Sequence, residues 1–396
     1  MNAETAPSLP YNGEVLQWAR LWRGRSVEDV AQRLQTNPEN IEAWEEGQTT
    51  PTVRQGRMLA DYYDRSFLEF FLDNPPDLRD SELIPDFRLH SDAGEADNAR
   101  EIWHIQRWAE EQRFNALDLF DMLGEEVPAF PAKLKATLES NPELIATNVR
   151  EATDFPIRRQ LELKGNDRRQ LPTIIRSAFE DFGVLVLRRT DLGKLGVRGI
   201  TIADTPLPTI VFGKEAATAQ AFTLSHEFGH ILLHQSGISG PPSAEDASTH
   251  AKAVERWCDR FAGAFLIPAT IMAERWAKPN EPMERVPDET LRSLALAFNV
   301  SRHAMLIRLV DLGYVEGGYY WRTMRPRFLQ EESEARTGGG RPEYYGTRYV
   351  NTQGNLYTGV VLEAWERGII TNDSAAQFMG IKNLSHLDDI REGFRA

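Results

Sequence analysis

The segment from Phe222 to His234 contains two histidines and a glutamate whose spacing suits a metal ion. On an α-helix, His226 and His230 lie four residues apart and project from one face. Two imidazoles in this HExxH arrangement can hold one zinc ion, with Glu227 beside them as a general base. A catalytic zinc site normally has three protein ligands and one open position for water. The pattern therefore predicts a third ligand elsewhere in the chain.

Two carboxylates further along the chain can supply it. Glu255 and Asp259 are again four residues apart and share one helical face. We expect Glu255 to be the third zinc ligand. Asp259, one turn later, is expected to accept a hydrogen bond from the other ring nitrogen of a ligand histidine, which fixes its tautomer. The alternative is that both motif histidines are ordinary surface residues of an amphipathic helix.

The remaining candidate side chains have weaker support. His250 is the last residue of segment 243–250, which is rich in small and polar residues. A mobile loop there could reach over the cleft and bring His250 to a developing oxyanion. His234 lies one turn beyond the second predicted ligand, too far from the same metal, and is expected at the surface. His104 has no carboxylate motif around it and is expected in the core or at the surface. Cys258 is expected to be a buried structural thiol.

Apolar patterns predict the elements that must position these residues. Helical spacing of apolar residues around both motifs predicts two helices that pack together. Three short apolar runs before them predict a small sheet, at 183–187, 199–202 and 209–212. An edge strand beside an HExxH zinc site can pair with an extended peptide, but which of the three strands is the edge stays open.

The N-terminal part of the chain predicts five short helices between residues 13 and 72. Ser26 is a suitable N-cap for the second helix, and Pro38 suits the first turn of the third. The fourth helix begins near Pro51, and the fifth is the apolar run from Phe67 to Leu72. This spacing resembles the helix-turn-helix of the Xre family of DNA-binding domains.

The third of these helices is acidic, which weakens the case for DNA binding. It carries four glutamates and no arginine or lysine, and residues 13–65 hold 9 acidic and 7 basic side chains. Phosphate contacts dominate DNA affinity and require cations. Asn40 and Gln48 could read adenine. The best case is a homodimer whose arginines face the DNA backbone, namely Arg20, Arg23, Arg25, Arg54 and Arg57.

Other patterns extend the helical prediction along the chain. An amphipathic pattern over 97–123 predicts one long helix or two joined ones. Two helices with a turn at 299–301 are predicted from residue 287 to residue 313. Residues 322–342 read as a flexible linker by composition. The apolar residues beyond it predict a small C-terminal unit that docks on the rest of the protein or on a partner.

The two motif segments, FTLSHEFGH and FAGAFLIP after Glu255 and Asp259, resemble those of the ImmA/IrrE family of zinc metallopeptidases. The resemblance covers roughly residues 170–320 and implies a zinc-dependent endopeptidase that cleaves a regulatory protein, such as a transcription repressor. It also implies a C-terminal domain found in larger members that carry an N-terminal helix-turn-helix, some of them antitoxins. At Trp257 and Cys258 the family more often has a polar residue followed by alanine. This difference affects packing and not metal ligation.

Composition narrows the class of protein further. A formal net charge of -14 disfavours broad adhesion to nucleic acid or to anionic membranes. The sequence has no apolar run of about 20 residues and no recognisable secretory signal. A single cysteine excludes an intramolecular disulfide framework. These features predict a cytoplasmic protein.

We therefore expect a mostly helical α+β protein. The predicted domains are a helix-turn-helix (1–75), a helical connecting region (76–168), a zinc-peptidase core with a trailing helical unit (169–321), and a linker with an interaction domain (322–396). Two functions compete. The first is an endopeptidase with Zn²⁺ as cofactor and a protein substrate, either a helix-turn-helix repressor or a toxin encoded nearby. The second is a transcriptional regulator or antitoxin with a structural zinc site, which acts by binding DNA and a toxin.

Overall fold

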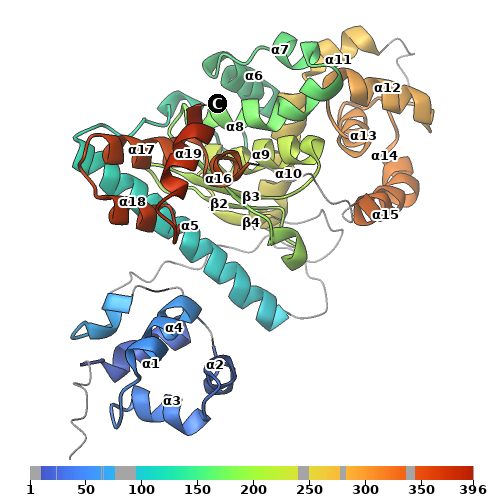
Figure 1. Cartoon of the computed structure of the whole chain (residues 1–396). Helices are drawn as coiled ribbons and strands as arrows, with labels where there is room; N and C mark the ends of the chain where they lie inside the picture. Colours follow the sequence, from blue (N-terminus) through green and yellow to red (C-terminus); the bar gives the residue numbers. More distant parts are fainter. Residues whose placement is uncertain are drawn as a thin grey trace, which may run out of the picture. The chain divides into compact units, whose positions relative to one another are not determined.

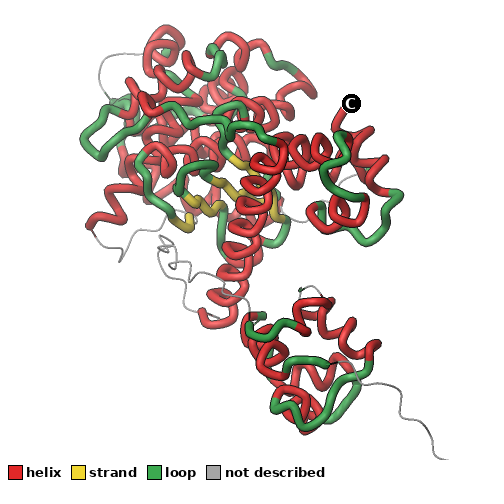
Figure 2. Tube along the Cα trace, turned by 90° about the vertical axis from the view of Figure 1, so that its left-hand side faces the viewer, coloured by secondary structure: helices red, strands yellow, loops and turns green. Residues whose placement is uncertain are grey.

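The computed structural model describes residues 10–23, 25–63, 65, 67–75, 95–239, 249–276, 282–335 and 344–395. The chain divides into two units, Met1–Leu83 and Ile84–Ala396. Within the described residues, no helix combines the length and the apolar character that crossing a membrane requires. The fold is mostly helical with one small sheet, as the sequence predicted (Figures 1 and 2).

The described residues of the first unit form four α-helices and a 3-10 helix around an apolar core. Ser26 caps the second helix: its hydroxyl accepts from the amide of Asp29 at 3.1 Å, and the Asp29 carboxylate accepts from the amide of Ser26 at 3.1 Å. The predicted fifth helix is present but is of the 3-10 type. The elements are α1 (Gly13–Trp22), α2 (Val27–Leu34), α3 (Pro38–Glu45), α4 (Val53–Tyr63) and η1 (Phe67–Phe71).

The second unit is built on a four-stranded sheet with the order β1-β3-β2-β4. The strands are β1 (Leu185–Arg189), β2 (Gly199–Ile202), β3 (Thr209–Gly213) and β4 (Gly237–Ser239). β1 runs parallel to β3, and β2 runs antiparallel to both β3 and β4. β1 begins two residues later than predicted, after Gly183 turns the chain with a φ of 68°. The sequence did not predict β4.

Along each strand, successive side chains point to opposite faces of the sheet, and helices cover both faces. Val186, Ile210 and Phe212 belong to the core shared with α8 (Leu171–Glu180), α9 (Ala217–Leu232) and α10 (Thr249–Leu266). On the opposite face, a second core of other strand residues packs against α5 (Glu95–Leu123) and the C-terminal helices. Figure 2 shows the short strands enclosed by helices. The HExxH segment thus belongs to a helix that packs on a sheet whose two faces are both covered.

The C-terminal helices dock on the chain's own core. In Figure 1 they lie beside α5. The buried Glu180 of α8 accepts hydrogen bonds from the amide of Asn355 at 3.1 and 3.2 Å, and Arg176 donates to the carbonyl of Asn351 at 2.6 Å. The helices are α16 (Tyr345–Gln353), α17 (Asn355–Glu366), α18 (Asn372–Phe378) and α19 (His386–Arg395).

Further helices complete the unit, and two of them correct the sequence analysis. The segment interpreted as a flexible linker begins with the end of a π-helix, η5 (Tyr320–Met324), and continues as α15 (Arg325–Ala335). Its remainder, up to residue 342, lies outside the described residues. The pattern over 97–123 forms one continuous helix, α5. The predicted pair after residue 287 is present as α12 (Asp288–Phe298) and α13 (Arg302–Asp311).

The remaining elements are short or lie at the periphery of the sheet. They are η2 (Ala132–Leu134), α6 (Pro142–Ala152), α7 (Ile157–Glu162), η3 (Gly165–Gln170), η4 (Leu192–Leu195), α11 (Ala269–Arg275) and α14 (Gly317–Tyr319).

Candidate metal centre

Helices α9 and α10 approach closely because a glycine faces a small residue between them. A Cβ added at Gly229 would lie 3.2 Å from both the Cα and the Sγ of Cys258. Cys258 is fully buried, as expected for a structural thiol. Its neighbour Trp257 donates from its indole to the carbonyl of Ser140 at 2.9 Å. The two residues that depart from the family pattern therefore serve packing.

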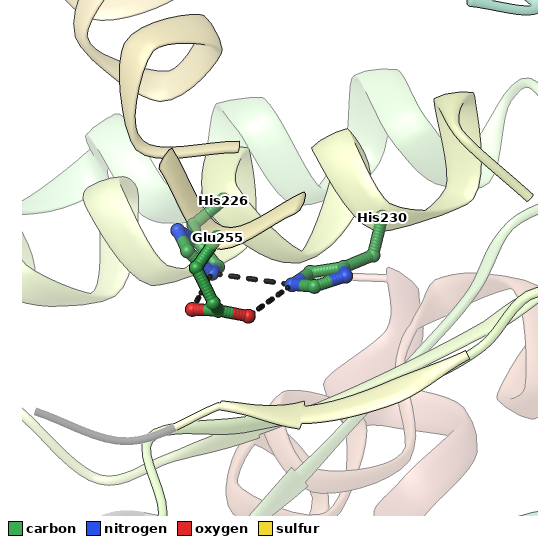
Figure 3. A group of neighbouring side chains, drawn as sticks. All are labelled: His226, His230 and Glu255. Atoms are coloured by element: carbon green, nitrogen blue, oxygen red, sulfur yellow. Dashed lines mark hydrogen bonds and ion pairs between the residues drawn. The ribbon is translucent and has the colours of Figure 1, made fainter. Parts of the chain in front are cut away.

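This packing brings together one glutamate and two histidines (Figure 3). The Nε2 atoms of His226 and His230 are 3.3 Å apart. Glu255 places Oε2 at 3.3 Å from Nε2 of His226 and Oε1 at 3.1 Å from Nε2 of His230. His230 is fully buried, and His226 nearly so. The three side chains thus point their donor atoms at one common position.

A fourth side chain orients one of the histidines. Nδ1 of His226 lies 3.0 Å from Oδ1 of Asp259. Because a carboxylate only accepts hydrogen bonds, Nδ1 carries a proton, and a bound metal would therefore replace the proton on Nε2. Burial lowers the pKa of His226, but Glu255 and Asp259 outweigh burial and hold it well above the usual value. For Glu255, burial raises the pKa, but the two histidines outweigh it and bring the pKa to about 2.

Glu227 is held beside the cluster by strand β2. Its side chain is fully buried, and Oε2 accepts a hydrogen bond from Oγ1 of Thr201 at 2.7 Å. Oε1 has no hydrogen-bond partner among the described residues. The carboxyl group lies over Gly199, where an added Cβ would meet Oε1 at 2.3 Å. Burial raises the pKa of Glu227, which favours a group that can accept a proton.

A cavity of about 160 Å³ opens beside these residues. His226, Glu227, Glu255 and Asp259 border it, together with other residues of α9 and residues of α13. Ser239 of β4 borders it and places its hydroxyl 3.3 Å from Nε2 of His230. Among the described residues, β4 is an edge strand of the sheet. Of the three strands that the sequence predicted, β1 lies at the other edge, so the edge beside the cluster is formed by a strand that the sequence did not predict.

The structure corrects the expectation for His250. His250 lies in the first turn of α10, is exposed and does not border the cavity, so it is not placed to contact a reacting group there. The rest of the expected loop, up to residue 248, lies outside the described residues. The histidine of α13 that does border the cavity is His303, whose Nε2 lies 2.9 Å from the hydroxyl of Tyr320. His234 is exposed just beyond α9, and His104 is buried, both as expected.

The structure also corrects the expectation for Arg20. Its guanidinium donates to both carboxylate oxygens of Glu45, at 2.6 and 2.8 Å, and to the carbonyl of Arg25 at 3.0 Å. Both side chains of this ion pair are buried. Arg20 is therefore engaged in the core of the first unit and does not present its charge to a DNA backbone.

The other DNA-contact candidates are more accessible. Arg54, Arg57, Asn40 and Gln48 are exposed, and Arg23 and Arg25 are half-buried. The guanidinium of Arg25 lies 5.0 Å from the centre of the Tyr62 ring, and that of Arg57 lies 5.9 Å from the centre of the Phe67 ring. Asn40 donates to the hydroxyl of Thr36 at 2.8 Å, and Gln48 donates to Glu46.

Two segments of the chain match models of known protein families. Residues 179–310 match the model of the IrrE N-terminal-like domain, a peptidase family. Residues 16–70 match a helix-turn-helix model. Both matches confirm the resemblances drawn from the motifs. No curated protein and no solved structure gives a significant match to the chain. The IrrE-like domain spans the whole sheet, both motif helices and most of α13.

Several residues around the cluster could not be predicted from the sequence, including those that contact Glu227. Thr201 and Gly199 lie in the predicted second strand, but no local pattern indicates that this strand packs against the motif helix. Ser239 belongs to a strand of three residues, too short to show alternation. His303 lies about 70 residues beyond the motif, and only the fold brings it to the same cavity. Such long-range pairings have no signature in a single sequence.

Proposed function

We propose that the protein is a zinc-dependent endopeptidase of a bacterial regulatory or stress-response system, and that it cleaves a regulatory protein such as a helix-turn-helix repressor. The match to a peptidase family, together with a helix-turn-helix match, supports a regulatory metallopeptidase. The observation that carries the proposal is the convergence of three potential metal-ligand side chains beside a buried glutamate, one of whose oxygens has no hydrogen-bond partner among the described residues.

The donor atoms fit zinc in both kind and spacing. Two imidazoles and one carboxylate are a ligand set that catalytic zinc sites use. With bonds of about 2.0 Å in a tetrahedron, ligand atoms lie about 3.3 Å apart. The two Nε2 atoms are 3.3 Å apart, and each lies close to one oxygen of the Glu255 carboxylate, His230 at 3.1 Å from Oε1 and His226 at 3.3 Å from Oε2. A zinc ion bound there would polarise a peptide carbonyl and lower the pKa of water.

The chain's own residues then divide the remaining work. Glu227 takes a proton from the attacking water through Oε1 and passes it to the leaving amine, while Thr201 holds Oε2 in place. Asp259 keeps the ring of His226 in the orientation that directs Nε2 to the metal. His226, His230 and Glu255 are the proposed ligands.

A second candidate function is a regulator or antitoxin that acts by binding DNA and a toxin, with a structural zinc site. The helix-turn-helix match and the separate core of the first unit favour it. The exposed Arg54 and Arg57 could contact phosphates, while the exposed glutamates of α3 oppose them. Because Arg20 neutralises Glu45, the surface of α3 is less acidic than its sequence suggests.

Substitution of Glu227 by Gln separates the two functions. The ligands are untouched, so zinc and fold should persist, while cleavage should fall by a factor of roughly 100 to 10,000. The variant should retain its partner as an uncleaved complex, and the neighbouring gene product and the cell's helix-turn-helix repressors are the first partners to assay. Glu274→Gln is a matched control, because Glu274 is exposed on α11. Equal toxin neutralisation by wild type and Glu227→Gln, with no cleavage by either, would leave the binding function standing.

A further inference from the structure

The cavity beside the metal cluster extends along an apolar wall. Ala219 and Phe222 of α9 line this wall together with Ala304 and Ile307 of α13. Ala219, Phe222 and Ile307 are only half-buried, so apolar surface remains open to a bound molecule. Concave sites with apolar walls beside a few polar groups are the usual form of a ligand subsite.

The small residues in this wall create the space. A longer side chain at Ala219 or Ala304 would occupy part of the volume that the cavity now offers. Phe222 and Ile307 also border a neighbouring cavity of about 320 Å³, so they form part of the partition between the two. A side chain that enters the first cavity therefore meets apolar groups from both helices.

The charges around the cavity oppose an acidic occupant. Three carboxylates border it, those of Glu227, Glu255 and Asp259, together with the guanidinium of Arg198. Arg198 is itself 3.7 Å from Glu215, which offsets its charge. An aliphatic or aromatic side chain gains from contact with the wall and meets no such opposition.

We infer that the wall formed by Ala219, Phe222, Ala304 and Ile307 is a specificity subsite for a bulky apolar side chain of the substrate, next to the bond that is cleaved. The inference rests on the proposed peptidase function, because only a substrate held at the metal cluster would place its adjoining side chain here. The substrate is then a protein segment with an aliphatic or aromatic residue beside the scissile bond.

Amino acid hydroxamates test this subsite without knowledge of the natural substrate. Their common group chelates zinc, and their side chains probe the neighbouring space. We would measure the binding of acetohydroxamate and of glycine, leucine, glutamate and lysine hydroxamates to the zinc-loaded full-length protein by calorimetry. Leucine hydroxamate should bind on the order of 10- to 100-fold more tightly than glycine hydroxamate, because its side chain becomes buried. The glutamate compound should gain nothing over glycine, because carboxylates border the cavity, and the lysine compound should bind less tightly than the leucine compound, because its ammonium group loses hydration at an apolar wall.

Variants that fill the space provide the second part of the test. Ala219→Leu should remove the advantage of leucine hydroxamate and leave acetohydroxamate binding unchanged. Ala304→Leu, on the opposite helix, should do the same and replaces Ala219→Leu if that variant does not fold. Ala217→Leu is the matched control, because Ala217 is also half-buried on α9 but does not border the cavity. It should keep the full preference for leucine.

The outcomes distinguish the subsite from the metal site. Failure of the protein to hold zinc or to bind acetohydroxamate would overturn the proposed function and the subsite with it. Binding of acetohydroxamate with equal affinity for the leucine and glycine compounds would overturn the subsite alone. A leucine preference that survives both filling variants, or a stronger preference for lysine or glutamate, would also overturn it.

Discussion

Substitution of Gly199 by Ala should displace the proposed base while leaving the metal ligands in place. A Cβ at this position would lie 2.3, 2.4 and 2.6 Å from Oε1, Cδ and Cγ of Glu227. Since ordinary van der Waals contact of carbon atoms begins near 3.5 Å, the carboxyl group must move by about 1 Å. That movement breaks the alignment with Thr201, which now holds Oε2 at 2.7 Å.

The expected magnitude follows from this displacement. A misplacement of about 1 Å at a reacting group can cost about 100-fold in rate. Overpacking of a buried site also costs roughly 1 to 3 kcal/mol in the free energy of unfolding. The zinc content should stay near that of the wild type, because His226, His230 and Glu255 lie on α9 and α10 and not on β2.

The assay compares Gly199→Ala with a control on the neighbouring strand. At Gly213 of β3, an added Cβ would meet its nearest atoms at 3.6 and 3.7 Å, which is ordinary contact. Gly213→Ala should therefore cleave like the wild type. Cleavage of the partner trapped by Glu227→Gln, zinc content and thermal unfolding would be measured for both variants. Wild-type cleavage by Gly199→Ala, or loss of its zinc, would show that Gly199 does not act by leaving room for the Glu227 carboxylate.

Three further predictions concern both units of the chain. Asp259→Ala should weaken zinc binding by about 10- to 100-fold without abolishing it, as a competition titration with a chelator would show; unchanged affinity would contradict the role given to Asp259. Arg20→Ala should destabilise the first unit by roughly 3 to 5 kcal/mol in denaturant unfolding, because it leaves the Glu45 carboxylate buried without its partner. Adding Glu45→Ala should recover part of the lost free energy of unfolding. If the double variant is no more stable than Arg20→Ala, the unpaired Glu45 carboxylate is not the cause of the loss. The full-length protein should bind duplex DNA weakly and with a shallow salt dependence, and nanomolar binding to a specific site at about 150 mM salt would contradict this.

The sequence predicted the motif helices well because their signals are local. His226, His230, Glu255 and Asp259 each depend on a spacing of four residues, which an α-helix converts directly into a shared face. Ser26 and Asp29 likewise interact within one helical turn, so the second helix of the first unit could be located by its cap. Local geometry determines all of these positions.

Features that depend on distant contacts could not be predicted in the same way. From the sequence, Arg20 is expected at the surface. The packing of α1 against α3 brings it to Glu45, which neutralises its charge. The glycine and arginine content of residues 322–342 suggested a linker, but tertiary packing of Met324 and Phe328 stabilises helix there. The support of Glu227 by Thr201 joins residues 26 positions apart. Each of these pairings requires the whole fold.

X-ray diffraction data collected on both sides of the zinc absorption edge would show whether His226, His230 and Glu255 bind zinc. We expect one strong anomalous peak per chain, at about 2.0 to 2.2 Å from Nε2 of His226, Nε2 of His230 and a carboxylate oxygen of Glu255. The peak should be absent from His226→Ala crystals and present in Glu227→Gln crystals. No peak between the three side chains in zinc-supplemented wild-type crystals, or a peak that persists in His226→Ala, would contradict the account.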